Sequence, residues 1–489
     1  MKQQPSFYHF VWCEKSNKKL LTIGLLAGIC FILLLRLLFP FPSFYADSYT
    51  YIDAAAEKQP ISFRPIQYSE FIRFFHHFNA SAFPLILAQY VTTLLANLFL
   101  FFSCIYLFEL PKHLKTVLFA LLVFNPLYLL SANYVLSDSF FCSLTTIWFT
   151  CLIWVIYKPC AANMLSQFVV LILLFKLRYN ALIFPCFTLL ALLFSHQAIW
   201  KKVLVTGFSF GVMFLLMNSI SNTTEELTGT RTFSAFSGWQ MAGDAMHILR
   251  NVPADTTDFD DEQREINHFI LNYLAEVDSL KQQEEEITAS YIWDKKSPLK
   301  QYLYYYGSKN YYNNYFETWT ALGPVYNRFG ASVIAQQPFA YIKYFVAPNA
   351  KRYFIPVMEA YSEYNEGRDT MAKVAAKYYG YSTTKVDAGY ATLHKNLLSP
   401  WRYLFTIINI FFIIAALVYA ITGAYKKHSR LFNQSLLLFG AFYLGNLLFV
   451  SAVAPNVFRY HLFIIAPALA FTIYLSYFMW QKKKKKMAS

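Results

Sequence analysis

Residues 164–195 read MLSQFVVLILLFKLRYNALIFPCFTLLALLFS, and this stretch decides the topology of the chain. Its roughly 32 residues would make a single helix about 48 Å long, whereas one membrane span needs about 20 residues. The polar run KLRYN at residues 176–180 interrupts the stretch near its middle. We therefore predict two short helices, residues 164–177 and 181–195, that meet at this run.

Eight other apolar runs are candidates for membrane spans. They cover residues 20–38, 83–108, 116–130, 140–156, 203–220, 403–424, 431–453 and 461–480. Only 14% of the 489 residues are charged and 56% are hydrophobic, which excludes both an ordinary soluble enzyme and a disordered chain. Together with the two short helices, the eight runs predict an all-α polytopic membrane protein with about ten transmembrane helices.

The positions of the basic residues orient these helices, because lysine and arginine gather on the cytoplasmic side of a membrane. Lys15, Lys18 and Lys19 precede the first apolar run, and five lysines at residues 482–486 follow the last. We therefore predict that both termini are cytoplasmic and that residues 221–400 lie outside, as in a multi-pass protein of a bacterial inner membrane. Because the net charge of +14 comes from such clusters, it predicts membrane lipids as partners and no nucleic acid.

This topology divides the chain into three regions. Residues 1–220 form an N-terminal transmembrane module with functional external loops. Residues 221–400 form an external domain that is mainly helical and partly interfacial, and residues 401–489 contain the last membrane helices and a basic tail. The acidic segment 255–286 of the external domain is interpreted as a solvated helical region whose role stays open.

Two prolines mark a further element of the external domain. Pro338 and Pro348 bracket residues 339–347, and proline favours the first turn of a helix but interrupts its interior. Aromatic and basic residues surround this segment, a mixture typical of the lipid headgroup layer. We therefore predict an interfacial helix that ends before Pro348.

Two aspartates lie at the predicted external ends of helices. Asp47 follows the first apolar run by about nine residues, and Asp138 directly precedes the fourth. Each could serve only as a helix N-cap, since aspartate accepts hydrogen bonds from the free amides of a first turn. By topology they also share one side of the membrane, where two carboxylates can divide the roles of general base and of orienting or metal-binding group. Asp47 and Asp138 are therefore the candidate catalytic residues.

Three cations share that side. Lys176 and Arg178 lie where the two short helices meet, at a depth where a charge costs up to about 3 kcal/mol unless it faces water or an anion. Arg459 directly precedes the last apolar run. These three residues are candidate phosphate ligands, although the stems of lysine and arginine can also reach the surface by snorkelling.

Arg64, Tyr51 and Tyr460 complete the candidate site as substrate-binding residues. The histidines and cysteines show no metal-ligand spacing, and the chain has no glycine-rich phosphate loop. A divalent cation such as Mg²⁺ or Mn²⁺ would therefore depend on Asp47 and Asp138, and whether one binds stays open. No cofactor is predicted with certainty.

At these positions the sequence resembles the GT-C superfamily of integral-membrane glycosyltransferases, and is similar to its family 39 and its aminoarabinose or mannosyl transferases. Five short motifs carry the resemblance: Ala46-Asp47-Ser48-Tyr49-Thr50-Tyr51, Arg64-Pro65-Ile66-Gln67-Tyr68, Leu136-Ser137-Asp138-Ser139, Leu177-Arg178-Tyr179-Asn180-Ala181 and Arg459-Tyr460. Their order along the chain and their side of the membrane agree with the topology that the charges predict. Most of the external domain is not covered by the motifs.

The resemblance implies a glycosyltransferase that moves a sugar from a polyprenyl-phosphate donor to an acceptor hydroxyl on the external face, with inversion. It implies that Asp47 is the base, that Asp138 orients it or the acceptor, and that Lys176, Arg178 or Arg459 binds the donor phosphate. The sugar stays open, as does the acceptor, which could be lipid A, a glycan lipid, a polymer or a protein.

Two other classes of protein are alternatives. A transporter or lipid flippase places ionisable groups near the middle of the membrane, and the apolar runs here are nearly free of them. A scaffold would use the external domain to bind a partner and the cations only to hold lipid. The crowding of charges on one side favours the enzyme.

Overall fold

The computed structural model describes residues 5–279, 291–310, 312, 314–453 and 456–487. Within these ranges the chain is helical and contains no strand, only three isolated β-bridges. The predicted all-α class is therefore confirmed. In the acidic segment, residues 261–279 are helical, whereas residues 284–286 lie outside the described residues.

The N-terminal module is a bundle of long apolar helices joined by short ones. Its elements are α1 (Phe7–Trp12), α2 (Lys15–Leu38), α3 (Ala46–Ala56), α4 (Gln67–His76), α5 (Phe83–Leu107), α6 (Lys112–Val123), α7 (Pro126–Ala132), α8 (Asp138–Tyr157), α9 (Ala161–Leu177), η1 (Tyr179–Ile183), α10 (Phe184–Phe194) and α11 (Ile199–Thr228). After the inserted residues, the bundle is completed by α21 (Trp401–Ile421), η5 (Ala424–Lys427), α22 (Arg430–Val453), η6 (Phe458–His461) and α23 (Leu462–Met487).

Eight helical segments of the described chain are long and apolar enough to cross a membrane. They are Lys15–Leu38, Phe83–Leu107, Lys112–Ala132, Asp138–Tyr157, Ile199–Thr228, Ala391–Ile421, Arg430–Val453 and Phe458–Gln481. Each of them contains most or all of one predicted run, which confirms a multi-pass membrane protein.

The break at residues 176–180 is present. α9 ends at Leu177, and Arg178 has an extended backbone with φ −151° and ψ 130°. The 3₁₀ turn η1 follows and leads directly into α10, whose second residue is Pro185. The sequence therefore predicted two helices too short for ordinary spans, and it also located the turn between them.

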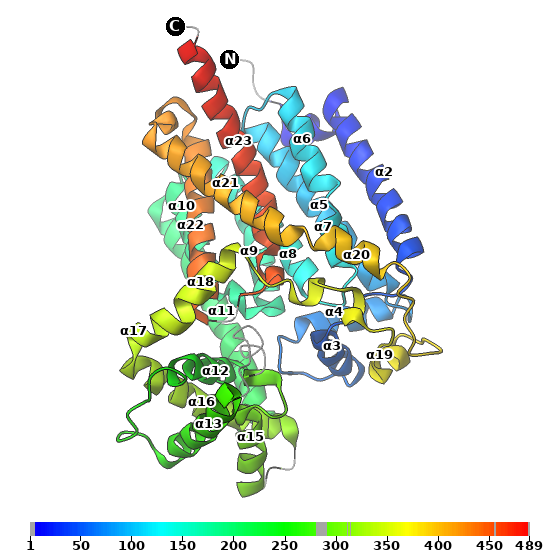
Figure 1. Ribbon diagram of the computed structural model, residues 1–489. Helices are drawn as coiled ribbons and strands as arrows, with labels where there is room; N and C mark the ends of the chain where they lie inside the picture. The colour runs from blue at the N-terminus through cyan, green and yellow to red at the C-terminus, as the bar shows by residue number, and fades with distance from the viewer. Residues whose placement is uncertain (1–4, 280–290, 311, 313, 454–455, 488–489) are drawn as a thin grey trace.

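Both ends of the chain lie at one end of the bundle, and α3, α4 and the inserted helices lie at the other (Figure 1). This arrangement agrees with the predicted common side of the termini. It also places the loop after α2, the start of α8 and the start of α23 near the end that carries the insertion, where the candidate residues lie.

The residues inserted between α11 and α21 belong to two packing units. Their elements are α12 (Ser237–Leu249), α13 (Asp261–Ser279), α15 (Pro298–Lys309), α16 (Tyr315–Gln336), α17 (Pro338–Tyr341), η2 (Ile342–Val346), α18 (Ala347–Phe354), η3 (Glu359–Tyr361), η4 (Tyr364–Gly367), α19 (Lys373–Tyr378) and α20 (Ala391–Leu398). Buried residues from Ala235 to Val333 form a core of their own, which we call the inserted core. Buried residues from Tyr353 to Leu398 instead pack into the core of the bundle.

The prediction that the interfacial helix ends before Pro348 is wrong. The helical path runs from α17 through η2 and α18 to Phe354, so that Pro348 lies inside it. The five residues of η2, directly before α18, form a π-helix. A wider π turn changes which carbonyl faces the proline ring, and this lets the path continue past a residue that lacks an N–H donor.

Candidate active site

Asp47 lies in the first turn of α3 but is not its N-cap. The N-cap position is Tyr45, whose backbone N–H donates to the Ser48 hydroxyl over 2.9 Å. Ser48, and not Asp47, makes the side-chain hydrogen bond at this helix start, and the carboxylate of Asp47 faces other groups. The interpretation of Asp47 as only a helix cap does not hold.

Asp138 is placed in the same way at the start of α8. Ser137 occupies the N-cap position, and Asp138 is the first helical residue. A carboxylate in a first turn is stabilised by the helix dipole. Its side chain is only 1% exposed and faces guanidinium groups, so that its role also goes beyond capping.

A parallel β-bridge brings the two aspartates together. It pairs Ser43 with Tyr134, and its hydrogen bonds run from Ser43 N to Asn133 O and from Val135 N to Ser43 O, 2.9 and 3.1 Å long. Each aspartate follows its bridge residue by four positions. The register of this short pairing therefore fixes the predicted proximity of Asp47 and Asp138.

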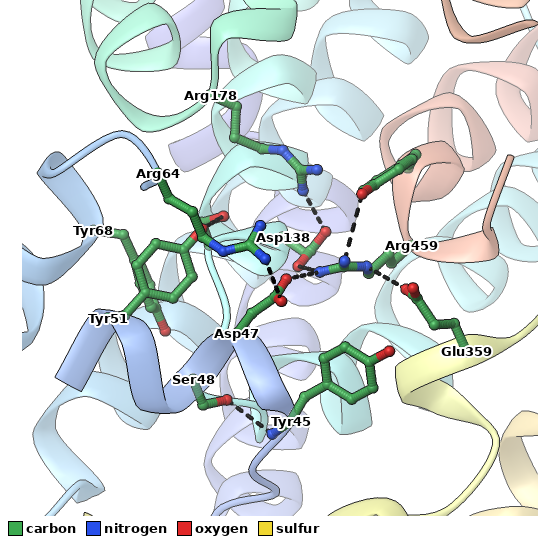
Figure 2. Close-up of polar contacts among 12 residues, drawn as sticks. Tyr45, Asp47, Ser48, Tyr51, Arg64, Tyr68, Asp138, Arg178, Glu359 and Arg459 are labelled. Atoms are coloured by element: carbon green, nitrogen blue, oxygen red, sulfur yellow. Dashed lines mark hydrogen bonds and ion pairs between the residues drawn. The ribbon is translucent and has the colours of Figure 1, made fainter. Parts of the chain in front are cut away.

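Asp47 forms two ion pairs. Arg64 Nη2 lies 2.5 Å from its Oδ1, and Arg459 Nη1 lies 2.7 Å from its Oδ2 (Figure 2). Arg64 comes from the loop between α3 and α4, and Arg459 comes from η6. The side chains of Asp47 and Arg459 are each 7% exposed, so this second pair is buried.

Asp138 links the turn between the short helices to the same cluster. Arg178 donates from Nη1 to its Oδ1, and Arg459 Nη1 lies 3.7 Å from its Oδ2. The Arg178 guanidinium also lies over the Tyr460 ring, 4.7 Å from the centroid. Arg459 thus faces both candidate catalytic carboxylates.

Glu359 is a third acidic member of the cluster, and sequence reasoning missed it. Its Oε2 accepts a 2.6 Å hydrogen bond from Arg459 Nε (Figure 2). A second parallel bridge, Val357 with Val457, sets this contact, since each partner follows its bridge residue by two positions. No local motif surrounds Glu359, and the contact depends on a pairing across 100 residues, so the sequence carries no signal for it.

The cluster is balanced in charge. It contains three carboxylates and three guanidinium groups, and most of these side chains are largely buried. Withdrawing ions from water costs several kcal/mol each, so every member depends on its opposite charges. Arg459 is the hub of the cluster, because it contacts all three acids.

The pKa of Asp47 reflects this environment. Burial alone raises the pKa of a carboxyl group, but the Arg64 and Arg459 guanidinium groups outweigh burial and hold the pKa of Asp47 below its ordinary value. Asp47 is therefore ionised at neutral pH. It accepts protons poorly for as long as both arginines stay paired with it.

Of the remaining candidate residues, Tyr51 and Tyr460 lie at the cluster and Lys176 does not. The Tyr51 hydroxyl lies 3.2 Å from the Ser137 hydroxyl, next to Asp138, and the Tyr460 hydroxyl accepts a long 3.4 Å hydrogen bond from Arg459 Nη2. Both tyrosines therefore line the cluster. Lys176 does not join it: no hydrogen bond or ion pair connects its ammonium group to another described residue of the site.

A divalent cation does not fit the side chains present. Among the described residues, no group of three or more histidine, cysteine, aspartate or glutamate side chains could hold a metal ion. Asp47 directs both of its oxygens at guanidinium groups, and Asp138 directs one. The positive charge at this site comes from arginine.

Comparison with known proteins gave no match: no protein-family model, curated protein or solved structure is similar to this chain.

Proposed function

We propose that the protein is a membrane glycosyltransferase that moves a sugar from a polyprenyl-phosphate donor to an acceptor hydroxyl. The observation that carries the proposal is the cluster of Asp47, Asp138, Arg64, Arg178 and Arg459 at one end of the bundle. Carboxylates supply a general base, and fixed guanidinium groups stabilise the charge that develops on a departing phosphate. We further propose that this end faces the outside of a bacterial inner membrane.

In the proposed reaction, Arg459 and Arg178 bind the phosphate of the donor. Asp47 takes the proton of the acceptor hydroxyl while the acceptor oxygen attacks the anomeric carbon. The bond from that carbon to the phosphate oxygen breaks, and the lipid phosphate leaves with the electron pair. A single displacement of this kind inverts the anomeric configuration.

The paired state of Asp47 suggests how donor binding activates the base. A phosphate at Arg459 shares that guanidinium with Asp47 and weakens their pairing, because phosphate is a strong partner for arginine. Losing part of that pairing raises the pKa of Asp47 toward its ordinary range, because Arg459 is one of the three arginines that lower it. Donor binding would thus make Asp47 a better base when the acceptor arrives.

An open cavity of about 510 Å³ beside the cluster suits the polyprenyl chain. Its lining is rich in phenylalanine and has charged groups among it: Gln67, Glu70, Phe71, Arg73, Phe74, Phe75, His77 and Phe140. Phe140 is two residues from Asp138 along α8, and Gln67 is three residues from Arg64, so in the proposal the phosphate end of the lipid lies toward these two residues. Binding sites for apolar ligands combine this kind of apolar lining with a few polar groups.

The placement of charge supports an enzyme over the alternative of a transporter or lipid flippase. Transporters bind substrates near the middle of the membrane, often at broken helices that occur in two corresponding halves. Here the ion pairs gather at one end of the bundle, and the break between α9 and α10 carries Arg178 toward that end.

The test is a transfer assay with the purified full-length protein in lipid nanodiscs. Labelled polyprenyl-phosphate hexoses and pentoses serve as donors, a bacterial membrane extract supplies acceptors, and release of polyprenyl phosphate is measured. We expect Asp47→Asn to lower the rate by about 10²- to 10⁴-fold, the usual range for a general base. Asp53→Asn is the matched control, because Asp53 is exposed on the same helix.

Full activity of a correctly folded Asp47→Asn variant would falsify the catalytic assignment. Lack of turnover with every donor, together with movement of a labelled lipid across the bilayer of a proteoliposome, would support the flippase instead.

A further inference from the structure

Glu359 has an unusual backbone for a residue that holds an ion pair. Its φ of 47° lies in the left-handed region, which residues other than glycine rarely adopt. Such conformations persist only where the surrounding structure enforces them, and they gather at functional sites. Here the enforcing contacts are the Val357–Val457 bridge and the 2.8 Å hydrogen bond from Phe458 N to Val357 O.

The chain segment that contains Glu359 is also held in place on its C-terminal side. Asn365 N donates to the Ser43 hydroxyl over 2.9 Å, and Phe44 N donates to the Asn365 side chain over 3.3 Å. Glu359 therefore lies between two anchors on the bundle, next to the loop that leads to Asp47. Its side chain can leave Arg459 without detaching either anchor.

Glu359 is the acid that can leave most easily. Its side chain is 27% exposed, compared with 7% for Asp47 and 1% for Asp138. A partly exposed carboxylate regains its hydration when it moves outward. If either aspartate left its arginine, it would remain buried in the bundle without a partner.

Glu359 contacts the edge of the Arg459 guanidinium that carries Nε and Nη2, and only one of these two donors makes a short hydrogen bond. Nε donates to Glu359 over 2.6 Å, but Nη2, the second donor on that edge, makes only the long 3.4 Å bond to Tyr460. The Tyr45 and Tyr460 rings lie over the guanidinium, with centroids 5.5 and 5.0 Å from its central carbon. A phosphate has the geometry to accept from both donors of such an edge at once.

We propose that this edge of Arg459 is an anion subsite, that the Glu359 carboxylate and the phosphate of a lipid-linked phosphate compete for it, and that Glu359 thereby limits phosphate binding. The inference rests on the proposed function and adds a regulator to its phosphate site. Because the cluster is balanced in charge, a phosphate that enters while Glu359 stays in place brings surplus negative charge. When Glu359 swings out, the phosphate replaces it and the balance returns.

The test is binding of polyprenyl phosphate to the full-length protein in nanodiscs, with inorganic phosphate and the uncharged polyprenol as the other two probes. We expect Glu359→Gln to bind polyprenyl phosphate about tenfold more tightly than the wild type, with polyprenol binding unchanged. Glu359→Gly should show the same gain, since glycine suits the left-handed backbone. Glu363→Gln is the control, because Glu363 lies nearby but pairs with Lys395 over 2.8 Å outside the cluster.

A similar gain for inorganic phosphate alone would show that the subsite takes the free ion and needs no lipid. If both Glu359 variants bind polyprenyl phosphate no more tightly than the wild type, the subsite proposal is wrong while the proposed enzyme stands. If binding tightens but no donor sugar is transferred, the subsite stands and the proposed enzyme fails. If no form of the protein binds polyprenyl phosphate or phosphate, both fail.

Discussion

Two buried cations, one in each core, are held in opposite ways. Arg459 at the end of the bundle contacts three carboxylates. Lys300 in the inserted core lies among aromatic rings: its ammonium is 3.9 Å from the centroid of Trp319 and donates to the Tyr315 hydroxyl over 2.6 Å. Among the described residues, no carboxylate lies within ion-pair distance of Lys300.

The two surroundings affect the charge of the buried cation differently. Aromatic faces attract a cation but replace only part of its hydration, and burial lowers the pKa of Lys300 to about 8. Carboxylates keep their cation charged and can be exchanged for another anion. In the proposed function a ligand rearranges the charges at the bundle end, whereas the cation of the inserted core is part of the packing.

The largest effect that separates the two regions is expected at Arg459. Arg459→Met removes the hub and leaves buried carboxylates without a partner, which should lower the free energy of unfolding by about 3 to 5 kcal/mol. Denaturant unfolding in detergent micelles measures this change. Arg231→Met is the control, because its pair with Glu225 is about half exposed and should contribute no more than about 1 kcal/mol. Equal losses in the two variants would contradict the hub role.

A side chain added between α12 and α16 tests how closely the inserted core is packed. A Cβ at Gly238 would lie 1.8 Å from the backbone oxygen of Gly323, where α12 and α16 meet, and a backbone atom cannot move aside cheaply. We expect Gly238→Ala to destabilise the inserted core by about 1 to 3 kcal/mol, measured by tryptophan fluorescence during unfolding. Gly211→Ala in α11 is the control, since nothing lies within 4 Å of its added Cβ. A neutral Gly238→Ala would mean that the two helices are less closely packed.

The effect expected at Lys300 depends on pH and is confined to the alkaline range. The pKa of Lys300 is about 8 when folded and 10.5 as the ordinary value, so between these values the unfolded chain binds more protons. Stability should therefore rise with pH across this window, by at most about 1.4 kcal/mol per pH unit. Lys300→Met should abolish this rise, whereas exposed Lys296→Met should preserve it. A rise that persists in Lys300→Met would assign the titration to another group.

Sequence could predict the elements whose signal is local. The break at residues 176–180 is predictable because four polar or aromatic residues among these five interrupt a long apolar run. The grouping of Asp47, Asp138, Arg178 and Arg459 follows from the side of the membrane that the sequence predicts for each of them. The sequence does not predict the distances between these side chains, because they depend on the register of two short β-bridges.

The misses have physical reasons as well. Glu359 joins the site only through the Val357–Val457 pairing, which has no pattern of its own. Helix capping was an alternative role for Asp47, although the neighbouring serine makes the side-chain hydrogen bond at this helix start. Pro348 predicted a helix end because a π turn cannot be recognised from composition. The division of residues 221–400 between two cores reflects tertiary packing alone.

The hydrogen bond from Tyr45 N–H to the Ser48 hydroxyl has a consequence for the proposed reaction. Because Ser48 makes this bond at the start of α3, the bond does not depend on the charge of Asp47. In the proposed reaction Asp47 gains and loses a proton in every cycle, and the bond stays in place. The structural and the reactive roles thus lie on two adjacent residues.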